Sequence, residues 1–191
     1  MTKDELNILS NQLMNCSHYL EFGSGNSTTL AVSAPNIKKI TTVESDISFW
    51  NKLIFSGPEL KQSIESKRLE PLLINIGPTK EWGYPADTSH RHLWPNYSSG
   101  VFQNQPYYDL ILIDGRFRVA CTLQACIHMP PGTRIIIHDF FNRVHYHVVL
   151  PFLTLVDRAD TLGLFTIRNN NPDITNIMKE LIDIYQYQPG F

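Results

Sequence analysis

Short, mainly apolar runs recur along the chain, and segments with helical spacing separate them. Runs this short and this rich in Ile, Leu and Val are typical of strands that are covered on both faces of a parallel sheet. We expect such strands at residues 18–22, 37–45, 69–75, 108–114 and 133–139.

Helical spacing fills the intervals between these runs. Leu6, Leu9 and Leu13 recur on one side of an opening helix at residues 3–14. Further helices are expected at residues 27–33, 47–55, 58–67, 118–128, 146–153 and 173–187, and a closing hairpin at 154–159 and 162–168. This alternation predicts an α/β fold: a Rossmann-like, doubly wound, mainly parallel sheet with helices on both faces and a C-terminal antiparallel hairpin.

Residues 76–107 interrupt the alternation. This segment is rich in Gly, Pro, Ser and Asn, yet it carries several Trp and Tyr residues. A long loop inside a compact domain is usually functional, and its aromatic content argues against disorder. We predict a single domain over residues 1–191 with 76–107 as its substrate loop or lid. The alternative is a flap whose rings simply pack onto the sheet.

Composition narrows the class of protein. The 191 residues are 42% hydrophobic and 18% charged, with a net charge of −2, which is ordinary for a globular domain and gives no general attraction to nucleic acid or to an anionic membrane. No apolar run reaches membrane-spanning length, and the polar start is not a signal peptide. Cys16, Cys121 and Cys126 are expected to be buried free thiols in a cytoplasmic protein. We expect a monomer or homodimer, and the size is also compatible with one module of a larger glycan-modifying protein.

Polar residues gather where the predicted strands end. The first strand ends in Glu21 and turns through Gly23 and Gly25 into a helix, so the backbone there can approach a ligand closely. The second strand ends in Glu44, about 20 residues on, where a doubly wound nucleotide-binding fold places its ribose-binding carboxylate. The fourth strand ends in Asp114. Open α/β sheets bind their ligands at this edge.

This arrangement resembles the class I S-adenosylmethionine-dependent methyltransferases over roughly residues 17–168. Ile113-Asp-Gly-Arg116 and Ile137-His-Asp139 are similar to the strand ends of small O-methyltransferases, several of which act on sugar hydroxyls. The rival NAD-dependent oxidoreductase needs a third glycine where Thr28 stands. The resemblance therefore favours a methyltransferase that uses S-adenosylmethionine as its cofactor.

The resemblance also implies roles for individual residues. Glu21 would lie beside the methionine amino group, Glu44 would bind the ribose hydroxyls, and Asp114 would face the reacting methyl. The backbone of the glycine turn would hold methionine and ribose, and the end of the third strand would lie against the adenine. The implied cofactor-binding residues are Glu21, Gly23, Ser24, Gly25, Asn26, Ser27, Glu44, Ser45, Asn75, Ile76 and Asp114.

A hydroxyl acceptor needs a general base, because it is a poor nucleophile until it loses its proton. The candidates are Asp114, His138 and Asp139. The alternatives are a buried structural imidazole for His138 and, for the aspartates, ion pairs with Arg116 or Arg118. Some related enzymes hold Mg²⁺ with carboxylates at these two strand ends. Here Phe117 and His138 stand where such relatives carry a His and an acidic residue, so we favour a metal-independent reaction.

Aromatic faces suit sugar rings, and neighbouring basic residues supply hydrogen-bond donors. The expected acceptor is a carbohydrate or another small hydroxyl-bearing molecule, methylated on a sugar hydroxyl of a glycan or of a glycosylated small molecule. The alternatives are an NAD-dependent oxidoreductase and a non-catalytic binding module. The predicted substrate-binding residues are Trp82, Tyr84, His90, Trp94, Arg116 and His145.

Overall fold

The computed structural model describes residues 1–104, 106–169 and 171–191. Gln105, which belongs to the predicted loop, and Asn170 lie outside the described residues, as does the side chain of Ser56.

The described residues contain one seven-stranded sheet in the order β3-β2-β1-β4-β5-β7-β6. The five strands from β3 to β5 run parallel, and β7 pairs antiparallel with both β5 and β6. The strands are β1 His18–Phe22, β2 Lys39–Glu44, β3 Leu69–Leu73, β4 Leu110–Ile113, β5 Arg134–Ile137, β6 Leu153–Ala159 and β7 Leu162–Ile167. The predicted fold class, including its antiparallel closing hairpin, is confirmed.

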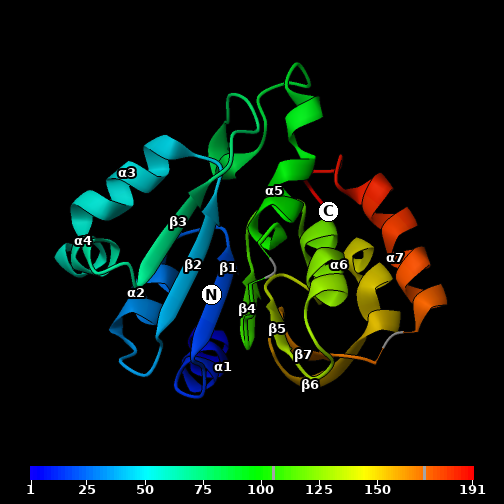
Figure 1. Ribbon diagram of the computed structural model, residues 1–191, viewed down its shortest axis with the longest axis horizontal. Helices are drawn as coiled ribbons and strands as arrows, with labels where there is room; N and C mark the ends of the chain where they lie inside the picture. Colours follow the sequence, from blue (N-terminus) through cyan, green and yellow to red (C-terminus); the bar gives the residue numbers. More distant parts are fainter. Residues whose placement is uncertain (105, 170) are drawn as a thin grey trace.

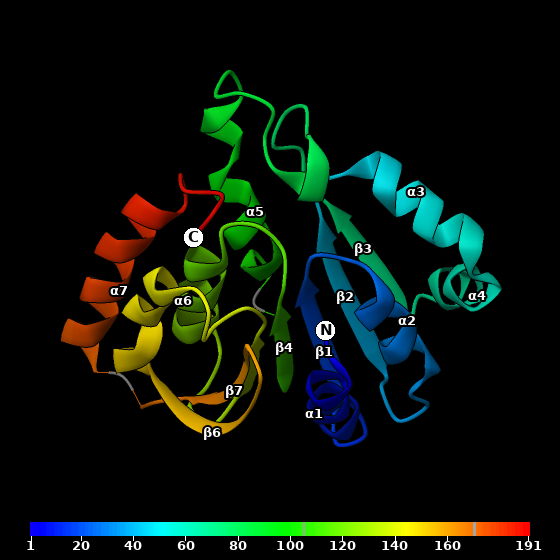
Figure 2. The same cartoon turned by 180° about the vertical axis from the view of Figure 1, so that it is seen from behind.

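Helices cover both faces of this sheet (Figure 1; Figure 2). One apolar cluster joins the sheet to α1–α4, and a second joins it to α5, α6, α7 and η4. The α-helices are α1 Lys3–Leu13, α2 Asn26–Ser33, α3 Ile47–Ser56, α4 Pro58–Glu65, α5 Pro95–Ser99, α6 Arg118–His128 and α7 Pro172–Tyr185. The 3₁₀ helices are η1 Glu81–Gly83, η2 Arg91–Leu93, η3 Gly100–Phe102 and η4 Val144–Phe152.

The central strands are mostly buried because both of their faces are covered. In β1, Leu20 and Phe22 belong to the cluster under α5–α7, whereas Tyr19 belongs to the cluster under α1–α4. Successive side chains of a strand point to opposite faces, so a doubly covered strand buries every position. Glu21 lies on the same face as Tyr19 and is therefore a charged residue inside the core.

Three local predictions need correction. The expected buried strand at 69–75 is β3, an edge strand in which only Leu69 is buried and Leu73 is 40% exposed. An edge strand has one neighbour and less cover, which explains the difference. The expected helix at 146–153 is the 3₁₀ helix η4, with Pro151 inside it. The segment 76–107 is not structureless, because it contains α5 and three 3₁₀ helices.

The strands β4 and β5 end just before the predicted catalytic residues. β4 ends at Ile113 and β5 at Ile137, so Asp114, His138 and Asp139 all lie in the turns that follow. Asp139 has a φ of 58°, in the left-handed region. Because the strand has ended, His138 and Asp139 no longer have to point to opposite faces of the sheet.

No helix of the described residues is long and apolar enough to cross a membrane. The three cysteines are free and buried, as predicted.

Candidate active site

The glycine turn after β1 packs against the turn after β4. Gly23 has a φ of 91°, and a Cβ on this residue would lie 2.7 Å from the Cα of Gly115 and 3.0 Å from the carbonyl carbon of Asp114. A Cβ on Gly25, by contrast, would meet nothing within 4 Å. The turn therefore touches the Asp114 segment on one side and presents open backbone on the other, at the start of α2.

Glu44 ties this turn to the end of β2. Its carboxylate accepts backbone N–H groups from Ser24 at 3.1 Å, Ser45 at 2.7 Å and Asp46 at 2.9 Å. The residue is 7% exposed, and burial raises the pKa of its carboxyl although the three N–H donors act to lower it. The carboxylate therefore lies at the junction of the glycine turn and β2, where the sequence predicts the ribose site.

Glu21 is fully enclosed beneath the first turn of α2. Its carboxylate accepts hydrogen bonds from Ser27 Oγ at 2.8 Å, from Tyr19 Oη at 3.2 Å and from Thr28 Oγ1. Burial raises its pKa to about 7, although these hydroxyl donors act to lower it. Thr28 also accepts the backbone N–H of Gly25 at 2.9 Å. The residue that replaces the third glycine of a dinucleotide motif thus braces the turn.

The segment predicted to contact adenine is only partly on the surface. Asn75 is exposed, and its Oδ1 accepts the backbone N–H of Gly77 at 2.9 Å. The side chain of Ile76 is 1% exposed and belongs to the core, and its carbonyl accepts the indole N–H of Trp94. Of this predicted pair, only Asn75 has an exposed side chain.

The three predicted catalytic residues lie in one polar cluster. His138 Nδ1 is 2.9 Å from Asp114 Oδ1, and Nε2 of the same ring is 3.3 Å from Glu5 Oε2. Burial acts to lower the pKa of His138, but the hydrogen bond and charge of Asp114, with the charges of Asp139 and Glu5, raise it overall. The ring therefore lies between two carboxylates that favour its protonated form.

Arg118 joins the two strand ends. It is 4% exposed, and its Nη1 donates to the His138 carbonyl at 2.6 Å. Its guanidinium is 3.1 Å from Asp114 Oδ1 and 3.5 Å from Asp139 Oδ2. Arg143 contacts the same Asp139 oxygen at 3.0 Å. Of the two arginines considered as partners for the aspartates, Arg118 takes that role.

Asp114 keeps one carboxylate oxygen open. The contacts from His138 and Arg118 both fall on Oδ1, and within the described part of the chain Oδ2 has no hydrogen-bond or ion-pair partner. The Asp114 side chain is 28% exposed, compared with 21% for Asp139 and 17% for His138. Asp114 is therefore the member of the cluster best placed to meet a ligand.

The sequence analysis missed Glu5, which comes from the opening helix α1. Its carboxylate is 1% exposed and accepts Thr161 Oγ1 at 2.7 Å and the Thr2 backbone N–H at 2.8 Å. Burial acts to raise the pKa of Glu5, but these hydrogen bonds and His138 lower it overall. The Thr2-x-x-Glu5 spacing is a helix-capping box, which signals the helix start but not the partner His138.

The predicted substrate-binding residues lie in different environments, and one of them is part of the core. Trp94 is 4% exposed and packs on Phe117 with ring centroids 5.7 Å apart, so its ring has a role in the core and is not available to an acceptor. Trp82 is 86% exposed, and Tyr84 stacks on the Arg116 guanidinium at 4.1 Å. The remaining two are His90, which packs against Gly77, and His145, whose Nε2 is 3.2 Å from the Gly190 carbonyl.

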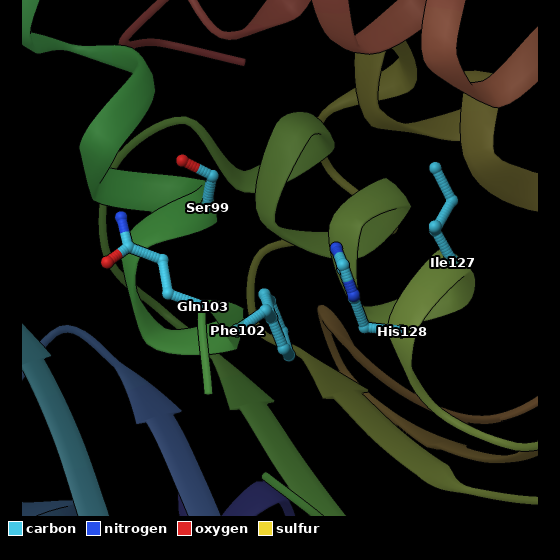
Figure 3. A pocket seen from close by; sticks show the side chains of 5 residues that line it. All are labelled: Ser99, Phe102, Gln103, Ile127 and His128. Atoms are coloured by element: carbon cyan, nitrogen blue, oxygen red, sulfur yellow. The ribbon is translucent and has the colours of Figure 1, made fainter. Parts of the chain in front are cut away.

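A separate cavity of about 440 Å³ lies elsewhere in the molecule. Its lining residues are Ser99, Phe102, Gln103, Ile127 and His128 (Figure 3). His128 ends α6, about 15 Å along the helix from Arg118, so this cavity is distinct from the polar cluster. No group of three or more His, Cys, Asp or Glu side chains among the described residues is arranged to hold a metal ion.

Comparisons with known proteins agree with this architecture. No protein-family model and no curated protein matches the sequence. A methyltransferase-like protein from Silicibacter pomeroyi superposes with a TM-score of 0.79 at 25% identity, over 95% of each chain. A proposed caffeoyl-CoA O-methyltransferase from Staphylococcus aureus gives a TM-score of 0.57 at 15% identity, over 88% of this chain and 85% of that chain. The N-methyltransferase NodS from Bradyrhizobium japonicum, in complex with S-adenosyl-L-homocysteine, gives 0.53 at 13% identity, over 86% and 88%.

The resemblance to class I S-adenosylmethionine-dependent methyltransferases is therefore confirmed, and the chain has the fold of that class.

Proposed function

We propose, from the methyltransferase fold of this chain, that it binds S-adenosylmethionine at the glycine turn and methylates a hydroxyl group of a sugar. The observation that carries the proposal is the packing of Gly23 on the Asp114–Gly115 segment. This packing supports the proposal, because a cofactor bound at the glycine turn would lie beside a carboxylate with an open oxygen, as methyl transfer to a hydroxyl requires.

The residues around the turn fit the cofactor. Gly25 leaves open space next to the backbone at the start of α2, and Glu44 lies where a ribose would meet it. Asn75 adds a polar side chain at the end of β3. When bound, S-adenosylmethionine supplies a methyl group on a sulfonium, a good leaving group that needs no further activation from the protein.

Asp114 is the proposed proton acceptor, through its Oδ2. Its other oxygen is held by His138 and Arg118, so the carboxylate is fixed in orientation. His138 is a positioning residue, because both of its ring nitrogens face carboxylates, whose contacts raise its pKa. Asp139 forms ion pairs with Arg118 and Arg143 and is the second candidate for the base.

The proposed acceptor is a carbohydrate or another small hydroxyl-bearing molecule. The exposed indole of Trp82 offers an apolar face of the kind that packs on sugar C–H surfaces, and the neighbouring Tyr84 adds a second ring. The net charge of −2 supports a small acceptor over a nucleic acid.

Calorimetric titration with S-adenosyl-L-homocysteine in excess chelator, with NAD⁺ in parallel, tests the cofactor assignment. We expect S-adenosyl-L-homocysteine to bind and NAD⁺ not to bind. Glu44→Gln should weaken binding about tenfold, because the variant lacks a charged acceptor. Glu180→Gln, an exposed substitution on α7, should have no effect. Binding of NAD⁺ alone would establish an oxidoreductase, and binding of neither ligand would leave a non-catalytic module.

A further inference from the structure

Arg116 is a buried cation without a matching anion. The residue is 7% exposed, and its Nε is a buried donor with no hydrogen-bond partner among the described residues. No carboxylate of the described chain lies within ion-pair distance of Arg116, whereas Arg118 and Arg143 both contact aspartates. Burial of an unpaired guanidinium is costly, so such a group is expected where a ligand completes its contacts.

The charge balance of the neighbouring cluster leaves Arg116 in surplus. Asp114 and Asp139 together neutralise Arg118 and Arg143. The third carboxylate, Glu5, contacts His138. Arg116 is therefore the arginine at this edge of the site that has no carboxylate partner among the described residues.

Tyr84 lies against this unbalanced charge. The Arg116 guanidinium stacks over the Tyr84 ring at 4.1 Å. Burial acts to raise the pKa of Tyr84, but the nearby guanidinium groups of Arg116 and Arg143 lower it overall. Stacking uses the face of a guanidinium and leaves its N–H donors, which lie in its plane, to find other acceptors. The phenol hydroxyl and the two guanidinium groups thus form one donor-rich corner, which we call the Arg116 corner.

We propose that the Arg116 corner, formed by Arg116, Arg143 and the Tyr84 hydroxyl, binds an oxyanion group carried by the methyl acceptor, either a carboxylate or a phosphate. Arg116 follows Asp114 by two residues, so their Cα atoms lie at most about 7 Å apart. An anion held at the corner would fix the acceptor while its hydroxyl lies at Asp114 Oδ2. This inference rests on the proposed function and adds the charge class of the acceptor to it. A planar guanidinium is suited to either oxyanion.

The side-chain Nε–Hε resonance of Arg116 reports any change in the surroundings of its guanidinium when an anion binds. We would record ¹H–¹⁵N spectra of the full chain with and without S-adenosyl-L-homocysteine and titrate glucuronate, glucose 6-phosphate and neutral glucose as probes. The two charged probes distinguish a carboxylate from a phosphate. We expect one or both to move the Arg116 Nε–Hε signal saturably, and neutral glucose to leave it in place.

Variants supply the second measurement. Arg116→Gln should weaken binding of the active anion at least tenfold while the affinity for S-adenosyl-L-homocysteine changes by less than about twofold. Arg168→Gln removes an exposed arginine after β7, at the opposite edge of the sheet, and should leave both affinities unchanged. The wild-type titration decides the matter even if Arg116→Gln does not fold.

The outcomes separate this inference from the proposed function. If S-adenosyl-L-homocysteine binds but neither anion moves the Arg116 signal, the acceptor is not recognised by charge and the inference is overturned. An equal response to neutral glucose overturns it as well. If S-adenosyl-L-homocysteine does not bind, the proposed function fails, whereas the response of Arg116 to the anions is still measured without it.

Discussion

Glu21 is a carboxyl group whose protonation is coupled to folding. It is fully buried, and burial raises its pKa from an ordinary 4.5 to about 7. Below pH 4.5 the group is protonated in both the folded and the unfolded chain. Between pH 4.5 and 7 the folded chain keeps a proton that the unfolded chain has lost, so the free energy of unfolding falls as the pH rises. Above pH 7 both states are ionised and no further change arises from this group.

Glu21→Gln removes this dependence, because an amide stays neutral and keeps the size of the carboxyl. A pKa difference of about 2.5 corresponds to about 3 kcal/mol. The variant should therefore gain about 3 kcal/mol in free energy of unfolding relative to the wild type between pH 4.5 and pH 8. Urea unfolding followed by circular dichroism at several pH values measures that difference. Comparison with the wild type cancels the titration of the other groups.

The exposed variant Glu180→Gln is the control, and its difference from the wild type should stay flat with pH. A difference between Glu21→Gln and the wild type that is constant with pH, or that moves in the opposite direction, would refute the argument. A constant difference would mean that the hydroxyl donors around Glu21 compensate its burial fully, and the opposite direction would mean that they outweigh it.

Three further perturbations follow from the same contacts. Gly23→Ala should lower the free energy of unfolding by about 2 kcal/mol more than Gly132→Ala, which is the scale of overpacking. Both glycines have a positive φ, but only a Cβ on Gly23 would strike the Gly115 backbone. Equal losses in urea unfolding would contradict the packing argument. Arg68→Ala should lower the free energy of unfolding by about 3 kcal/mol, since its guanidinium donates to four carbonyls near the end of α2; a change below 1 kcal/mol would be evidence against it. Asp114→Asn should lower turnover at least about 100-fold, the scale of general-base catalysis, at unchanged affinity for S-adenosyl-L-homocysteine, and full turnover would exclude Asp114 as the base.

The fold and the strand-end carboxylates were predictable from the sequence because they depend on local patterns. The acids that close the short strand patterns locate Glu44 and Asp114 at one edge of the sheet, whereas Glu21 lies inside β1 and is enclosed in the core. The helix at 118–128 is likewise confirmed, because its spacing and the turn at Pro130 are local signals.

What the sequence did not reveal depends on contacts between distant segments. Trp94 looks like a surface aromatic because it lies in a polar stretch, but it packs against Phe117 in the core. The role of Glu5 depends on His138, which is far along the chain and carries no spacing signal. The open oxygen of Asp114 is a matter of side-chain geometry, and no residue pattern encodes which of two oxygens a partner uses.

The contacts of α1 also bear on when the molecule can finish folding during synthesis. Thr2 donates to Asp160 and Glu5 accepts from Thr161, so α1 is secured by residues more than 150 positions later in the chain. The chain is made from its N-terminus. Glu5 is one of the two carboxylates that contact His138, and it is therefore fixed in place only after the closing hairpin of β6 and β7 has been synthesised. A nascent chain that stops before residue 160 would have all five parallel strands but would lack the residues that secure Glu5 beside His138.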